Sequence, residues 1–241
     1  MPILSAFGAA KTLGGPGAFV PVQNYSYDFN GSSYFTYPAS SSFSIGTQQF
    51  SIECFVYLDS YPATTAAILD FGFSTGNTTP QRAQFYINSS GQPVFARNLY
   101  PTTPAVATAT SSIAVSLATW TYIAVSRLSS GVVRVFVGSS QGASTGLLSG
   151  AITSGSGITP SVGNGTVQTT RFLDGKLSNL RFNLGSSFSA ATVPTQPLTV
   201  DATTKMLTCQ SATIKDNSVA NGGGPWTLTN SGVTVSTSGP F

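Results

Sequence analysis

Residues 120–137, WTYIAVSRLSSGVVRVFV, contain the clearest structural signal in the chain. Two apolar runs, residues 120–126 and 132–137, are separated by a turn that contains Ser129, Ser130 and Gly131. β-branched and aromatic residues favour strands, and a short connection with glycine between two such runs is typical of a β-hairpin. The stretch therefore predicts two antiparallel strands joined by a tight turn.

Short strand patterns recur along the rest of the chain. In residues 50–58, FSIECFVYL, apolar side chains occupy the even positions, so this strand would bury one face and point its odd-numbered residues the other way. Further strands are expected at residues 71–73, 84–87, 92–96, 176–182, 206–210 and 227–236, with a long loop or an edge strand at 101–112. Because Gly, Pro, Ser and Thr interrupt every helical pattern, the sequence predicts an all-β sandwich.

The composition excludes several kinds of chemistry. The 241 residues include no histidine, which removes imidazole bases, Ser-His-Asp and Cys-His triads and histidine-ligated zinc. Only 7% of the residues are charged, and the ten Lys and Arg residues are dispersed, so no nucleic-acid partner is expected. The chain has no apolar run of 18 residues, so no membrane span is expected. A surface with so few charges suits contacts with other subunits or with carbohydrate.

Changes in composition divide the chain into an arm and one domain. Residues 1–22 are rich in Gly, Ala and Pro without alternation, which predicts an extended N-terminal arm and does not fit a secretory signal. Residues 23–241 are expected to form a single sandwich domain. Its last part, residues 198–241, is too short to be stable alone, so we expect it to pack back on the sandwich.

Four motifs resemble, in the same order, the strands of laminin-G-like, concanavalin A-like jelly rolls. They are Asp28–Phe35, Phe50–Tyr57, the hairpin of residues 120–137, and the pair formed by residues 163–165 and 172–181. The resemblance covers residues 25–185 and implies a two-sheet antiparallel jelly-roll sandwich. Lectins, enzymes, receptors and virion proteins share this fold, so it does not fix a function.

The end of the chain resembles laminin-G-like structural proteins of tailed phages, notably those of cyanobacterial hosts. The residues that carry this resemblance are Leu207–Ser211, Lys215–Ser218, Gly232–Ser236 and Gly239–Phe241. It implies a non-enzymatic virion protein, most simply a homo-oligomeric capsid decoration or cement protein that docks on other virion proteins through its arm. The alternative is a tail-fibre or receptor-binding module that recognises a host surface carbohydrate.

A carbohydrate-active enzyme is a third hypothesis, and the carboxylates argue against it. Glucanases of this fold use a Glu-x-Asp-x-x-Glu strand, whereas this chain has a single glutamate, Glu53. On a continuous strand Asp59 would lie about 20 Å from it, and a retaining pair requires roughly 5 Å. A dyad of Glu53 with Asp70 stays open as an alternative. The simpler interpretation of Glu53 is a polar position on the solvent-facing side of its strand.

Aromatic residues outside the core define the candidate interaction surface. Phe55 and Tyr57 lie on the odd face of the strand at residues 50–58, and Tyr61 follows them. This surface could be a subunit contact, a platform for a sugar or a face covered by the C-terminal segment. Trp120 and Phe136, in contrast, are expected to belong to the core.

Four aspartates fall at expected strand ends, where loop carboxylates could bind calcium: Asp28, Asp59, Asp70 and Asp174. No two of them are close in sequence, and hydrogen bonds to turns are the simpler role for each, so no cofactor is expected.

The two cysteines allow two interpretations. Cys54 falls on the apolar face of its strand, which predicts a buried free thiol. A disulfide between Cys54 and Cys209 would tie the last segment to the sandwich, but assembly in a reducing cytosol disfavours it.

Overall fold

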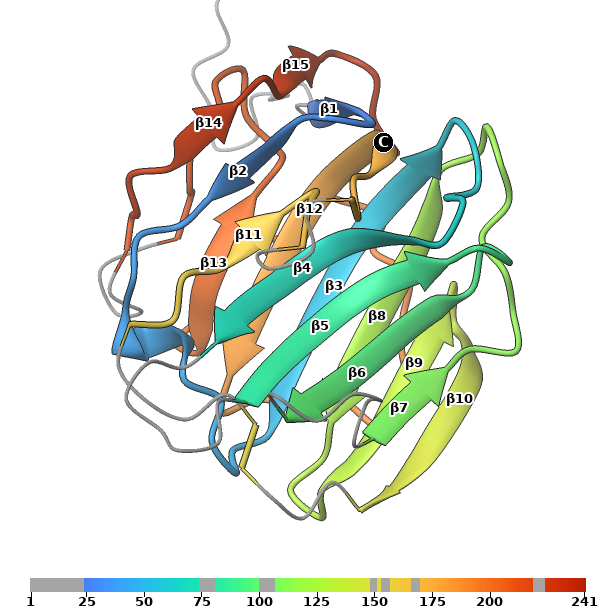
Figure 1. Ribbon diagram of the computed structural model, residues 1–241, viewed down its shortest axis with the longest axis vertical. Helices are drawn as coiled ribbons and strands as arrows, with labels where there is room; N and C mark the ends of the chain where they lie inside the picture. Colours follow the sequence, from blue (N-terminus) through green and yellow to red (C-terminus); the bar gives the residue numbers. More distant parts are fainter. Residues whose placement is uncertain are drawn as a thin grey trace, which may run out of the picture.

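The chain folds into two antiparallel β-sheets packed face to face (Figure 1). A computed structural model describes residues 24–73, 81–99, 107–147, 151–152, 157–165, 170–218 and 224–241. Among these residues the helical content is one 3₁₀ turn, Ser41–Phe43, and no helix is long and apolar enough to cross a membrane. The predicted all-β sandwich is confirmed, whereas the arm predicted for residues 1–22 lies outside the described residues.

The first sheet, sheet A, carries the hairpin that the sequence predicted. In spatial order it contains β10 (Ser140–Leu147), β9 (Val132–Val137), β8 (Thr121–Arg127), β3 (Phe50–Leu58), β12 (Asp174–Leu184), β1 (Ser26–Asn30) and β15 (Thr234–Ser236), and β13 (Thr204–Thr208) also pairs with β12. The hairpin is β8–β9, with Ala124 opposite Phe136. The central strands β3 and β12 are the longest strands of the sheet, and Glu53, Phe55, Tyr57, Lys176 and Arg181, considered below, lie on them.

The second sheet, sheet B, has seven strands. Its spatial order is β14 (Thr229–Ser231), β2 (Tyr34–Thr36), β11 (Ser161–Val162), β4 (Thr65–Phe73), β5 (Gln81–Asn88), β6 (Pro93–Leu99) and β7 (Ala107–Thr110). The stretch 101–112, expected as a loop or an edge strand, contains the edge strand β7. At that edge the two sheets meet, because the backbone N–H of Ser112 donates to the carbonyl oxygen of Gly142, 2.9 Å away.

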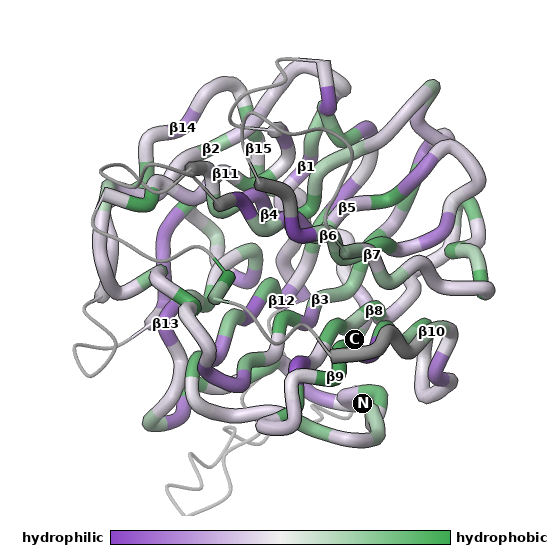
Figure 2. The backbone as a smooth tube through the Cα atoms, turned by 60° about the horizontal axis from the view of Figure 1, so that its bottom comes forward, coloured by the Kyte–Doolittle hydropathy of each residue, from purple (hydrophilic) through white to green (hydrophobic). Residues whose placement is uncertain are grey.

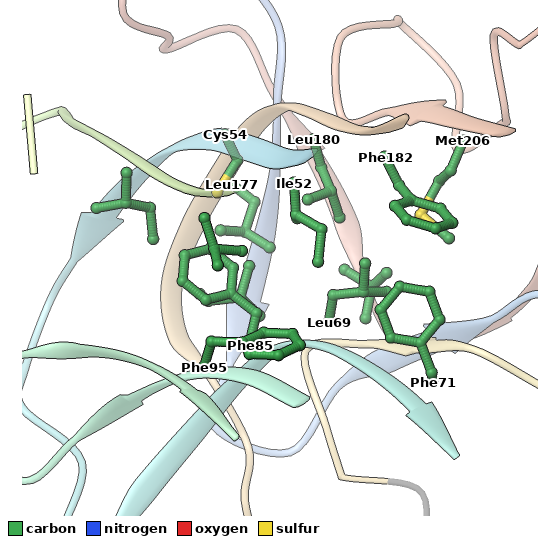
Figure 3. Close-up of a cluster of buried hydrophobic side chains, with 14 of the residues drawn as sticks. Ile52, Cys54, Leu69, Phe71, Phe85, Phe95, Leu177, Leu180, Phe182 and Met206 are labelled. Carbon is green, nitrogen blue, oxygen red and sulfur yellow. The ribbon is translucent and has the colours of Figure 1, made fainter. Parts of the chain in front are cut away.

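The core between the sheets follows from the two-residue period of the strands. The side chains that sheet A contributes include Ile52, Leu177 and Leu180, and they face Leu69 and Phe85 of sheet B (Figure 3). Hydrophobic and hydrophilic residues follow one another along much of β3 and β12 (Figure 2), and an irregularity in β12 between Ser178 and Arg181 lets both Leu177 and Leu180 face the core. One set of side chains of each strand therefore fills the core, and the other set is left on the outer face.

The C-terminal segment adds strands to both sheets. Residues 227–236 were predicted as one strand, and this prediction was wrong: β14 pairs with β2 in sheet B, whereas β15 pairs with β1 in sheet A. Gly232, with φ of 84°, lies between them and lets the chain turn from one sheet to the other. The buried carboxylate of Asp216 fixes the approach to these strands, accepting hydrogen bonds from the backbone N–H groups of Leu207 and Trp226 at 3.0 and 3.1 Å.

Both cysteines are buried free thiols, as the sequence predicted for Cys54. Cys54 lies on β3 and Cys209 directly follows β13, with β12 between these two strands. Neighbouring strands are about 4.8 Å apart, so α-carbons two strands apart lie about 10 Å from each other, whereas a disulfide needs less than about 7 Å. The fold therefore does not admit the alternative Cys54–Cys209 bridge.

Candidate functional site

A second apolar cluster lies on the outer face of sheet A, where the odd-numbered residues of β3 point. Phe55 is at its centre and is only 5% exposed, with its ring 5.4 Å from that of Tyr122 and 5.2 Å from that of Phe241. The chain ends beside β3 (C in Figure 1), so the last residue covers part of this face. Three alternatives were open for the candidate interaction surface, and at Phe55 the structure shows the third: this residue is covered by the C-terminal segment.

Residues 188–191 cover the neighbouring part of the same face. The ring of Phe188 lies 5.6 Å from that of Phe136, and Ala191 belongs to the same cluster. Trp120 is partly buried against it. Both Phe136 and Trp120 were expected in the core: Phe136 is buried, but in this outer cluster, and Trp120, directly before β8, is only partly buried against it.

The acid Glu53 lies on the outer face of sheet A as expected, but it is buried and does not face solvent. Arg181 donates from Nε and Nη2 to Oε1 of Glu53 at 3.1 and 2.7 Å, and the Tyr122 hydroxyl donates to Oε2 at 2.7 Å. Arg181 also donates to the carbonyl oxygen of Thr199, 2.7 Å away, which places the 188–201 segment over the acid. Burial first, and then the Glu53 charge, raises the pKa of Tyr122, so its hydroxyl stays a donor.

The Glu53–Asp70 dyad is not formed. Glu53 is on the outer face of sheet A, whereas Asp70 alternates with the core residues Leu69 and Phe71 and therefore points to the outer face of sheet B. Two packed sheets are about 10 Å apart, so the sandwich separates these two carboxyl groups by more than a glycosidase pair allows.

The outer face of sheet A is open at the C-terminal end of β3. Tyr57 and Trp120 are both partly exposed there, with their rings 5.6 Å apart. The ammonium of Lys176 lies 5.0 Å from the centre of the Tyr57 ring and 3.8 Å from a carboxylate oxygen of each of two exposed acids, Asp28 and Asp59. We call these five residues the Tyr57–Trp120 platform. It combines two aromatic rings with charged groups that can donate and accept hydrogen bonds.

Tyr61 belongs to a different surface from the other two predicted residues. Its side chain is 40% exposed, and its hydroxyl donates to the carbonyl oxygen of Val115, 2.9 Å away. Leu117 and Ile113, on the connection from β7 to β8, are also exposed. The predicted surface is therefore divided: Phe55 is covered, Tyr57 belongs to the platform, and Tyr61 lies among loops.

The outer face of sheet B carries a polar cluster that sequence reasoning missed. Asp70 accepts hydrogen bonds from Nε of Arg82 at 2.9 Å and from Nε2 of Gln84 at 3.0 Å. Nη1 of Arg171 donates to Oε1 of Gln84 at 3.0 Å, and its guanidinium carbon lies 5.8 Å from the centre of the Tyr86 ring. The alternation of polar and apolar residues along β5 could have shown that Gln84 and Tyr86 face outward. It could not have shown that Arg171, which is distant in sequence, joins them.

The aspartates named as calcium candidates have other partners. Asp28 and Asp59 share Lys176, and Asp174 accepts a hydrogen bond from the Ser60 hydroxyl at 3.0 Å. Within the described part of the chain, no group of three or more His, Cys, Asp or Glu residues could hold a metal ion.

Solved structures share this fold at low sequence identity. A proposed carbohydrate-binding protein from Bacteroides ovatus is 14% identical with a TM-score of 0.61; the match covers 90% of this chain and 60% of that protein. Domain 4 of an extracellular arabinanase from Geobacillus stearothermophilus, solved with arabinotriose, is 16% identical with a TM-score of 0.51, over 68% of this chain and 72% of that one. Domains LG4-5 of the mouse laminin alpha1 chain are 14% identical with a TM-score of 0.51, over 72% of this chain and 46% of that one.

The match covers 60% of the Bacteroides protein, so the chain spans about three fifths of that protein's length. Among curated proteins, no significant match was found. A family model described as "Concanavalin A-like lectin/glucanases superfamily" matches residues 29–193, which include most strands of both sheets. Since this match extends over more than half of the sequence, the chain belongs to the concanavalin A-like lectin/glucanase superfamily.

Proposed function

We propose that the chain is a non-catalytic carbohydrate-binding protein that takes its ligand on the Tyr57–Trp120 platform. The observation that carries the proposal is the pair of partly exposed rings of Tyr57 and Trp120, 5.6 Å apart, at the open end of an otherwise covered sheet face. Aromatic faces pack against the apolar faces of sugar rings and carry a partial negative charge that attracts C–H groups. A few polar groups beside such a surface then fix the orientation of the ligand.

The charged residues of the platform supply those polar groups. Carboxylates accept hydrogen bonds, as sugar hydroxyls require, and the lysine ammonium donates them. Asp28 and Asp59 are 38% and 47% exposed, whereas Lys176 is 20% exposed and lies between them. The Asp28–Lys176–Asp59 group can therefore bind hydroxyls on either side of a stacked ring.

A binding role is favoured over hydrolysis by the surroundings of the carboxylates. An inverting glycosidase leaves room for a water between its two acids. Between Asp28 and Asp59 that space holds the Lys176 ammonium, and Glu53 is buried against Arg181. The descriptions of two proteins with this fold, the Bacteroides protein and the arabinanase domain, also refer to carbohydrate.

The expected location is a phage particle, on which the protein would recognise a glycan of the host surface. This part of the proposal rests on the resemblance of residues 207–241 to phage structural proteins. Immunogold labelling of purified particles tests it. Labelling confined to tails supports host recognition, even labelling of heads supports the decoration role instead, and unlabelled particles exclude the virion.

The platform is tested by glycan-array screening of the full chain followed by calorimetry on the best ligand. Tyr57→Ala and Trp120→Ala should each weaken binding at least tenfold, whereas Tyr57→Phe keeps the ring and should retain most of it. Tyr34→Ala is the matched control, because Tyr34 is a partly buried tyrosine on sheet B, 6.2 Å from the ring of Phe172. Glycan binding that survives both alanine variants, or no glycan binding at all, would contradict the proposal.

A further inference from the structure

Arg171 is fixed on the outer face of sheet B, far from the platform. The backbone N–H of Ala67 donates to its carbonyl oxygen at 3.0 Å, which holds the main chain of Arg171 against β4. Its side chain extends to Tyr86 on β5, which alternates with the core residues Phe85 and Ile87 and so faces outward. Arg171 and Tyr86 are both partly exposed.

A buried hydrogen-bond network orients the Arg171 guanidinium. Asp70, Arg82 and Gln84 are 0%, 4% and 0% exposed, so their side chains are held in one arrangement. Because the Gln84 amide nitrogen donates to Asp70, its carbonyl oxygen must point the other way, towards Nη1 of Arg171. The opposite orientation of the amide would place an oxygen against a carboxylate. Arg171 is therefore pre-organised by a network that ends at its side chain.

The charges of this cluster do not balance. Asp70 is paired with Arg82, and the partner of Arg171 is a neutral amide. All seven carboxylate residues of the chain are described, and no ion pair of the described residues joins one of them to Arg171. Burial and, after it, the positive charge of Arg82 lower the pKa of Arg171, so an anion beside the guanidinium would be favourable.

We propose that Arg171 binds the carboxylate of an acidic sugar, such as a uronic acid, at a second site on the outer face of sheet B. This inference rests on the proposed function in taking the ligand to be a glycan. Tyr86 lies against one face of the guanidinium, so a carboxylate would approach its edge, where two parallel N–H groups match two carboxylate oxygens. The platform is on the outer face of sheet A and Arg171 on the outer face of sheet B, so the two sites would bind neutral and acidic sugars separately.

The experiment is calorimetry on the full chain with trigalacturonate, with neutral galactotriose and with sodium sulfate as separate probes. Trigalacturonate should bind, and Arg171→Gln should weaken that binding at least tenfold. Lys215→Gln removes the same charge from an exposed position and should leave it unchanged. Arg171→Lys keeps the positive charge but not the two parallel N–H groups, so its affinity for trigalacturonate should lie between those of Arg171→Gln and Lys215→Gln. Thermal unfolding of each variant checks the fold, and Arg171→Lys decides the matter if Arg171→Gln does not fold.

Three results would overturn the inference: no binding of trigalacturonate, binding that is unaffected by the Arg171 variants, or sulfate bound as tightly as the uronate. The first two reject the site, and the third replaces the acidic sugar by a simple anion. The platform is tested separately from Arg171. Tyr57→Ala should abolish binding of a neutral glycan and leave the Arg171-dependent binding of trigalacturonate intact. Each proposal can therefore fail while the other stands.

Discussion

Replacing Arg181 by methionine would leave the buried carboxylate of Glu53 without its cation. The wild-type acid is 5% exposed, with both arginine contacts on Oε1 and the Tyr122 hydroxyl on Oε2. Removing one partner of a buried pair costs about 3–5 kcal/mol, because the remaining charge loses its compensation. Tyr122 still donates to Glu53 in the variant, so the lower end, about 3 kcal/mol, is expected.

This loss should be visible in thermal and denaturant unfolding. For a chain of this size a change of 1 kcal/mol shifts the Tm by about 2–4 °C, so Arg181→Met should lower it by about 6–12 °C at pH 7.

The double variant separates charge from packing. Glu53→Gln in the Arg181→Met background removes the unpaired charge and should recover about 1–2 kcal/mol. Two results would refute the reasoning. A loss below about 1 kcal/mol for Arg181→Met would show that the ion pair contributes little to stability. A double variant as unstable as Arg181→Met at pH 7 would show that the unpaired charge of Glu53 is not the cause of the loss.

Two further predictions concern the strands around the sites. Gly175 has φ of 141°, and a β-carbon there would lie within van der Waals overlap of a carbonyl oxygen of β3, so Gly175→Ala should cost at least about 3 kcal/mol in urea unfolding. Gly46→Ala is the control, because its φ is also positive and its surroundings are open; about 1 kcal/mol is expected, and equal costs would contradict the steric explanation. Burial raises the pKa of the Cys54 and Cys209 thiols, so iodoacetamide at pH 8 should modify neither in the native protein and both in urea. Rapid native alkylation of either would show that the core opens.

The strands were predictable because their signal is local. The two-residue alternation at residues 50–58 correctly separates the core residues Ile52 and Val56 from the outward-facing Glu53 and Tyr57. The same alternation fails at residues 227–236, where both halves have strand character but pair with different sheets. Pairing partners are set by the whole fold, so a local pattern could not reveal the change of sheet at Gly232.

The burial of Glu53 could not be predicted from its own strand. A strand pattern shows which face a residue occupies, but it does not show what covers that face. Here the cover comes from Phe188, Thr199 and Phe241, more than 130 residues further along the sequence. The single glutamate of the chain therefore had the features of a solvent-exposed residue, although it is the buried acid of an ion pair.

The scarcity of charge makes the remaining charges more informative about binding. Most of the seven carboxylates have partners within the protein: Glu53 pairs with Arg181, Asp70 pairs with the buried Arg82, and Asp216 and Asp201 accept backbone N–H groups. Because only 7% of the residues in the chain are charged, few neighbours screen a charge that lacks an ion-pair partner. Arg171 is such a charge, and a network of buried side chains determines its direction. A protein that needed Arg171 only for solubility would not require a buried Asp70–Gln84 pair to orient it, so the network itself favours a ligand at this position.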